Sequence, residues 1–170
     1  MRKAISAVLI LFAAGCERHS VQAQTNPQVF VVSTYLDAAG DAEVSGLAAR
    51  KARLPQTRQL GATIQRTLAG IRDDLTRIAQ HRNVQLPKGL EEKKIALRDN
   101  LVILPGQVLD RAYALAMSQD LGALLKRLDS TNDGELQQVA KKYRPAIDAQ
   151  HRAADQLLKS LGGNPWPTAP

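Results

Sequence analysis

The fold is decided by residues 60–78, which have the sequence LGATIQRTLAGIRDDLTRI. The apolar residues in this stretch recur at intervals of three and four, so they share one face of a helix with about 3.6 residues per turn. Three more stretches have the same spacing, and together they predict four long amphipathic helices. The seam residues are Leu60, Ile64, Leu68, Ile71, Leu75 and Ile78; Leu36, Ala39, Glu43, Leu47 and Arg50; Leu109, Tyr113, Met117, Leu121, Leu124 and Leu128; and Leu136, Val139, Tyr143, Ile147, Gln150, Ala154, Leu157 and Leu161.

Residues that start or stop helices separate these stretches. Asn26-Pro27 is expected to cap the first helix, with Ser33 as an alternative start. Thr131 or Asn132 is expected to cap the last helix, and Gly162-Gly163 to end it. The boundaries therefore agree with the periodicity.

The pattern as a whole predicts an all-α protein, because no stretch alternates with period two for long. Four helices with one apolar face each form a four-helix bundle. The link between the second and third long helices contains a short amphipathic segment, Leu90 to Leu101, and is long enough to run the length of the bundle. We therefore expect a ferritin-like four-helix bundle with a short extra helix in this crossover.

The composition fits one domain and excludes several classes of protein. The chain has 170 residues, of which 44% are hydrophobic, so a packed core is expected. A single cysteine excludes an internal disulfide and a multi-thiolate metal site. Aromatic residues make up 4% of the chain, fewer than base stacking requires, so no nucleic-acid partner is expected.

The N-terminus resembles a bacterial lipoprotein signal. A positively charged start precedes an apolar run from Ala4 to Ala14, which is too short to span a membrane as a stable anchor. The run ends in Ala13-Ala14-Gly15-Cys16, and small residues directly before a cysteine resemble the site where the signal is cut and the cysteine is acylated. Ordinary cleavage after Ala23 is the alternative. We expect export to the periplasm and a lipid anchor at Cys16, with Glu17 favouring the outer membrane.

These features divide the chain into four parts. Residues 1–15 are the expected signal peptide of the lipoprotein type, and residues 16–26 a polar tether. Residues 27–163 are the helical bundle domain, and residues 164–170 a proline-rich tail.

Several short motifs carry a resemblance to a known family. They are Glu43-Val44 with Gly46-Leu47-Ala48 and Lys51; Asn83-Val84-Gln85-Leu86-Pro87; Leu109-Asp110-Arg111-Ala112-Tyr113; and Pro145-x-Ile147. In order and spacing they are similar to a family of exported bacterial outer membrane proteins that contain a domain of unknown function. The resemblance covers about Tyr35 to Leu161 and implies a ferritin-like four-helix bundle. It makes Glu43, Asp110 and Tyr113 candidate site residues.

The resemblance also implies where metal ligands would lie. The family places inward-facing histidines on the second, third and fourth long helices, together with a glutamate on the first. In this chain the three histidine positions are Leu68, Leu121 and Gln150. Leucine cannot bind a metal and glutamine is a poor ligand for a transition metal, so we expect no metal and no cofactor. The remaining weak metal candidates are Glu43, Asp148 and His151, of which the last two have the i, i+3 spacing of a ferritin-like ligand pair.

Other motifs of catalysis are absent from the sequence. It contains no G-x-S-x-G elbow, no phosphate-binding glycine-rich loop and no H-E-x-x-H, so we expect no enzymatic activity. The family-matched residues have structural interpretations as well. Glu43 would pair with a facing arginine or tyrosine, Asp110 would accept a cap-like hydrogen bond, and Tyr113 would be a core aromatic residue.

Basic residues gather in two places, and they suggest what the protein binds. One group, Arg50, Lys51, Arg53 and Arg58, surrounds the turn between the first two helices, and the other, Lys88, Lys93, Lys94 and Arg98, follows the second helix. An exported protein with such groups could contact an anionic envelope component or a protein partner. We therefore expect a non-enzymatic, lipid-anchored envelope protein. The alternatives are a ferritin-like protein that handles metals or oxidants, and an inhibitor of a secreted effector.

Overall fold

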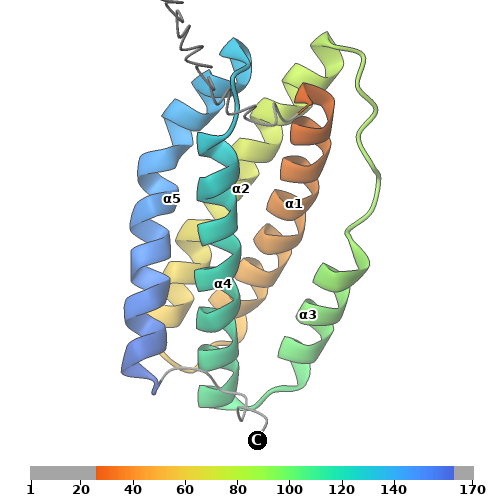
Figure 1. The fold of residues 1–170 in the computed structure, drawn as a ribbon. Helices are drawn as coiled ribbons and strands as arrows, with labels where there is room; N and C mark the ends of the chain where they lie inside the picture. Colours follow the sequence, from red (N-terminus) through yellow and green to blue (C-terminus); the bar gives the residue numbers. More distant parts are fainter. Residues whose placement is uncertain (1–25, 163–170) are drawn as a thin grey trace, which may run out of the picture.

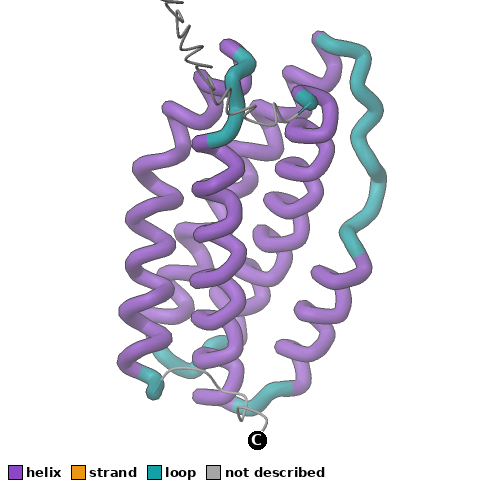
Figure 2. Tube along the Cα trace, in the orientation of Figure 1, coloured by secondary structure: helices purple, strands orange, loops and turns teal. Residues whose placement is uncertain are grey.

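The computed structural model describes residues 26–162, which form five helices and no strand (Figures 1 and 2). The helices are α1 (Pro27–Lys51), α2 (Pro55–His81), α3 (Glu92–Ile103), α4 (Gly106–Asp129) and α5 (Gly134–Ser160). The prediction of an all-α protein is confirmed for this part of the chain. The expected signal peptide, the lipid anchor at Cys16 and the proline-rich tail lie outside the described residues.

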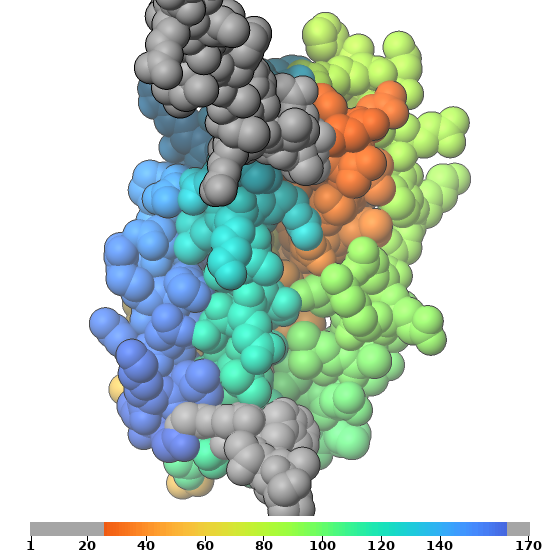
Figure 3. All heavy atoms as spheres, in the orientation of Figure 1, coloured from red at the N-terminus to blue at the C-terminus, as the bar shows by residue number. Residues whose placement is uncertain are grey.

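The four long helices pack side by side, and the short helix α3 lies outside them. α1 packs against α2 and α4, and α5 packs against the same two helices. α1 and α5 run in one direction and α2 and α4 in the other, so neighbouring long helices are antiparallel (Figure 1). The segment that joins α2 to α4 runs back along the outside of α1, and α3 forms a ridge on this side of the molecule (Figure 3).

The apolar faces of α2, α4 and α5 form most of the core. Every seam residue expected on α4 is buried, and on α2 only Leu60 is partly exposed. On α5 the seam is buried from Leu136 to Ala154, apart from the half-buried Tyr143. The expectation for Leu157 is wrong: it is half-buried, because it lies in the last turn of α5 at the end of the bundle.

The seam expected on α1 is buried only in part: Ala39 and Leu47 are buried as expected, and Leu36 is half-buried. Glu43 and Arg50 are exposed, whereas Asp41 and Ser45 are buried. α1 packs against α2, α3 and α4, so it is covered on three sides and Glu43 is the only exposed residue between Ala38 and Ala48. A helix buried on most of its surface has no single apolar face, and its orientation cannot be taken from periodicity.

The closest approach of α1 and α2 occurs at Gly61. A Cβ atom at this position would lie 2.7 Å from the carbonyl oxygen of Ser45 and 2.9 Å from the amide nitrogen of Ala49. Any larger residue would push the two helix backbones apart. Gly61 therefore sets the spacing of the pair.

The helix ends agree in part with the sequence signals. The Asn26 side chain accepts a hydrogen bond from the amide of Gln28, so α1 begins where expected. α5 is capped by Asp133 instead of Thr131 or Asn132, because the Asp133 carboxylate accepts hydrogen bonds from two amides of the first turn. Gly162 follows α5 with φ of 87°, the left-handed conformation expected there.

The cap of α5 is also where the end of α2 is attached. Arg82 pairs with Asp133 at 2.7 Å and with Glu135 at 2.7 Å. The Arg82 guanidinium and the amides of the first turn of α5 lower the pKa of Asp133 to about 2.

Among residues 26–162, no helix is both long and apolar enough to cross a membrane.

Candidate functional site

A buried ion-pair cluster joins α3 to the bundle. Lys94 of α3 is 3% exposed, and its ammonium group contacts the carboxylates of Asp41 on α1 and Asp120 on α4, the latter at 2.8 Å. Gly40 makes room for it, because a Cβ atom there would lie 2.7 Å from Lys94 Cβ. Lys94 and Leu101 are the buried residues of α3, so this cluster is one of the contacts that hold the helix in place.

The charges within this cluster do not balance. Two carboxylates share one ammonium, and burial together with the nearby Asp120 charge raises the pKa of Asp41 to about 7. Burial disfavours the charged form of Lys94, but the attraction of Asp41 and Asp120 outweighs it and raises the pKa of Lys94. The lysine therefore stays protonated near neutral pH, while Asp41 is the member that gains a proton as the pH falls.

The second expected basic group is exposed only in part, because Lys88 and Lys93 are exposed but Lys94 is not. Lys94 is buried, Lys93 pairs with Asp37 and Glu91, and Arg98 pairs with Asp99. The expectation is wrong for Lys94, because acids of α1 and α4 surround it and their positions depend on the tertiary fold, while Glu91 and Asp99 of the same segment pair with Lys93 and Arg98. The sequence held one usable signal: Gly40-Asp41 interrupts the apolar run of α1 with a small residue next to an acid.

A second polar cluster lies in the core next to the first. The hydroxyl of Tyr113, which is fully buried, donates a hydrogen bond of 3.1 Å to the Ser45 hydroxyl. Ser45 in turn donates to the sulfur of Met117 at 3.6 Å. Burial raises the pKa of Tyr113, so the phenol stays neutral and acts as a hydrogen-bond donor between α4 and α1.

Asp110 of the same family-matched motif attaches α4 to the start of α2. Both oxygens of its buried carboxylate lie 3.3 Å from the amide nitrogen of Leu54, the residue that precedes α2. This contact satisfies a helix-end amide that has no partner within the helix. The geometry agrees with the cap-like interpretation of Asp110 and places it at the turn between α1 and α2.

The three metal candidates are not brought together. Glu43 is exposed on α1, because Asp41 faces inward and a residue two positions later lies about 200° around the helix. Asp148 pairs with Arg152 at 2.5 Å, and His151 Nε2 lies 3.8 Å from Asp155. Across residues 26–162 no three His, Cys, Asp or Glu side chains are grouped so that they could hold a metal ion.

The three positions at which the resemblance implied histidines are filled by core side chains. Leu68 and Leu121 are fully buried and have no ligand atom. Gln150 donates hydrogen bonds from its amide nitrogen to the Thr67 hydroxyl at 2.7 Å and to the Thr63 carbonyl at 3.4 Å. Its amide group is thus used to join α5 to α2. These residues do not fit the metal that the resemblance implies.

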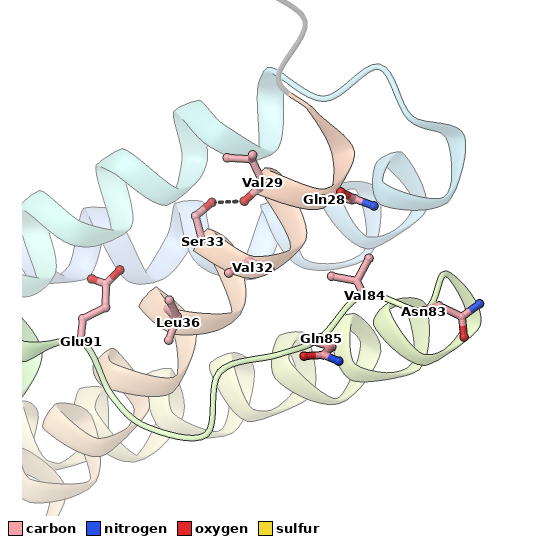
Figure 4. Close-up of a pocket in the computed structure, with 9 residues that line it drawn as sticks. All are labelled: Gln28, Val29, Val32, Ser33, Leu36, Asn83, Val84, Gln85 and Glu91. Carbon is pink, nitrogen blue, oxygen red and sulfur yellow. Dashed lines mark hydrogen bonds between the residues drawn. The ribbon is translucent and has the colours of Figure 1, made fainter.

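A hollow with a volume of about 510 Å³ lies between the start of α1 and the segment that follows α2 (Figure 4). Val29, Val32 and Leu36 of α1 form its apolar side. Its lining also includes Gln28, Ser33, Asn83, Val84, Gln85 and Glu91, and the Ser33 hydroxyl is bonded to the Val29 carbonyl. Such a lining suits an apolar ligand, with amide side chains of the protein at the edge of the hollow.

The first basic group has the exposure that was expected of it. Arg50, Lys51 and Arg53 are exposed at the turn between α1 and α2. Arg58 differs, because its guanidinium donates to the carbonyl oxygens of Ala52 and Arg53 and is used to hold the turn.

These observations define a class of protein: a helical bundle with an apolar core, two small buried polar clusters and a basic turn at one end. The chain belongs to the family described as "Domain of unknown function (DUF4142)", whose model matches residues 14–157. No curated protein and no solved structure matches the chain.

Proposed function

We propose that this protein is a lipid-anchored component of the cell envelope. Its bundle would stand in the periplasm, attached through Cys16 to the outer membrane, and would bind a partner or an anionic surface without catalysing a reaction. The observation that carries the proposal is the apolar run of residues 4–14 followed by Gly15-Cys16. The first helix begins at Pro27, eleven residues after this cysteine, so a short linker would separate the anchor from the domain.

The interior supports a binding role in preference to catalysis. Its polar groups are used to hold helices together: Lys94 with Asp41 and Asp120, and Tyr113 with Ser45. Leucines fill the core where a related protein would place ligands. The exposed side chains are therefore better candidates for binding a partner than the side chains of the core.

We further propose that the fold is a ferritin-like four-helix bundle. The antiparallel packing of neighbouring long helices and the crossover from α2 to α4 support this assignment. An experimental structure in which α2 and α4 ran in opposite directions would contradict it.

Labelling with a fatty acid tests the anchor. Cells that express the full chain and are fed a labelled fatty acid should incorporate the label into this protein, and Cys16→Ala should abolish incorporation. As a control, an exposed residue of the bundle such as Lys88 can be changed to Cys in the Cys16→Ala chain, and this variant should remain unlabelled. A mature N-terminus at Gln24, found by mass spectrometry, would overturn the proposal.

A further inference from the structure

An exposed apolar corner lies where α3 ends and α4 begins. Ile103 is 78% exposed, Val108 44% and Val102 42%. The core does not need these side chains, because Leu101 and Leu109 next to them are buried and supply the packing of both helices. Three large apolar side chains within seven residues of exposed chain indicate a contact surface.

Basic side chains from the turn between α1 and α2 border this corner. The Lys51 ammonium donates a hydrogen bond of 3.3 Å to the carbonyl oxygen of Val102. Arg53 lies on the other side, with its Cδ atom 3.5 Å from the position that a Cβ atom of Gly106 would occupy. Arg50 lies one position before Lys51 on the last turn of α1 and is exposed as well. We call these six residues the basic corner: Arg50, Lys51, Arg53, Val102, Ile103 and Val108.

Few acidic groups offset this charge. The carboxylate of Asp99 forms an ion pair with Arg98 at 2.8 Å, and the carboxylate of Asp110 is buried against the amide of Leu54. Arg50 and Arg53 form no ion pair with the described part of the chain. The corner is therefore apolar at its tip and positively charged at its side.

The shape of the corner favours a membrane over a folded protein. The nearest hollow, of about 160 Å³, is lined by Leu97, Leu101, Leu104 and residues of α4, but by none of the three exposed apolar residues. They are exposed on the surface and line none of the hollows described, so they do not form a groove for a peptide. Apolar side chains that project beside lysine and arginine are the pattern that enters the headgroup region of an anionic bilayer.

We propose that the basic corner binds the surface of an anionic phospholipid bilayer. The apolar tip inserts among the headgroups, and Arg50, Lys51 and Arg53 contact the lipid phosphates. This inference deepens the proposed envelope function by naming one of its surfaces. The corner lies at the end of α1 opposite Asn26.

Vesicle sedimentation tests the inference with the full chain carrying Cys16→Ala, so the result does not depend on whether Cys16 is acylated. The protein should bind vesicles of phosphatidylglycerol and phosphatidylethanolamine more strongly than vesicles of phosphatidylcholine. The difference should shrink in high salt, because screening weakens contacts with phosphate. All variants keep the same N-terminus, so any insertion of residues 4–14 contributes equally to each.

Two sets of changes separate the charge from the apolar tip. Arg50→Gln with Arg53→Gln should weaken binding to the anionic vesicles about tenfold or more, because each basic side chain near an anionic surface strengthens binding severalfold. Ile103→Ser should weaken it about fivefold or more. The matched control is Lys126→Gln with Lys141→Gln, which removes the same charge at the other end of the bundle and should change binding less than twofold.

Circular dichroism and melting temperature should be unchanged in every variant, since all five side chains are exposed. Equal binding to both kinds of vesicle, or equal loss in the corner and control variants, would overturn the inference. So would an absence of vesicle binding. Failed labelling of Cys16 together with positive vesicle binding would refute the anchor and leave the basic corner standing.

Discussion

Lys94 places an ammonium group inside the protein, in a space that Gly40 leaves open. Two acids, Asp41 and Asp120, are the partners of this group, and each comes from a different helix. A buried charge is tolerated only while its partner is present, so the three residues depend on one another. Replacing one of these residues tests how strongly the stability of the protein depends on the cluster.

Lys94→Met should destabilise the protein by about 3–5 kcal/mol near pH 8, since it removes the positive charge that pairs with Asp41, which must then take up a proton or remain charged and unpaired next to Asp120. Chemical denaturation measures the change. Lys93→Met is the matched control: Lys93 is exposed and pairs with Glu91 and Asp37, so its loss should cost at most about 1 kcal/mol. Similar values for the two variants would contradict the buried cluster.

The protonation of Asp41 predicts a dependence of stability on pH. Its pKa is about 7 in the folded protein against 3.8 for an ordinary aspartate, so between these values the folded state binds more protons than the unfolded state. The contribution of Asp41 to stability is therefore full below about pH 4 and declines as the pH rises through 7. The free energy of unfolding of wild type minus that of Asp41→Asn should fall over this window. A difference that did not vary with pH would show that Asp41 titrates normally.

At the scale of single elements, the sequence predicts helices well where they have one apolar face. The seams of α2 and α4 are correct because each helix has a side that remains in water. α1 misled the prediction because three helices cover it and its buried residues are mostly small: Thr34, Ala38, Gly40, Ser45 and Gly46 are examples. Glu43 was placed inside and Asp41 was not noticed for the same reason.

The candidate site was less predictable than the fold. Asp110 and Tyr113 were chosen from a motif, and both are buried and hydrogen-bonded. The role of Lys94 could not be predicted, because two adjacent lysines look alike in sequence and only the fold separates the buried one from the exposed one. The local pattern specifies helices, whereas ion pairs between helices depend on their relative rotation.

Substituting one seam leucine in α2 and one in α5 tests how deeply each position is buried in the core. Leu75→Ala should cost about 2–5 kcal/mol, because Leu75 is fully buried and its loss leaves a cavity. Leu157→Ala should cost less than half as much, because Leu157 is half-buried near the end of α5 and the site can relax or admit water. Chemical denaturation measures both losses of stability from the shift of the midpoint, with the slope of the transition unchanged. Equal losses would show that the end of α5 is more tightly packed than described.

At the scale of the whole molecule, the packed core predicts how the protein responds to metal ions. Leu68 and Leu121 occupy two positions at which the resemblance implied ligands, and Gln150 is bonded to Thr67. The purified protein should therefore contain no stoichiometric iron, zinc or manganese, and a chelator should leave its melting temperature unchanged. Elemental analysis and calorimetry measure both. One equivalent of tightly bound metal would contradict this account of the core.

The course of the chain between α2 and α3 has a further consequence. This segment crosses the outside of the molecule, so a break near Pro87 would divide the protein without unthreading its core. One fragment would hold the α1–α2 pair and the other the α4–α5 pair, and each would expose the leucines that the other covers. Lys94 would belong to the second fragment and Asp41 to the first, so the buried ion pair would connect the two pieces. The two halves could therefore be produced separately and recombined, as is done with split proteins.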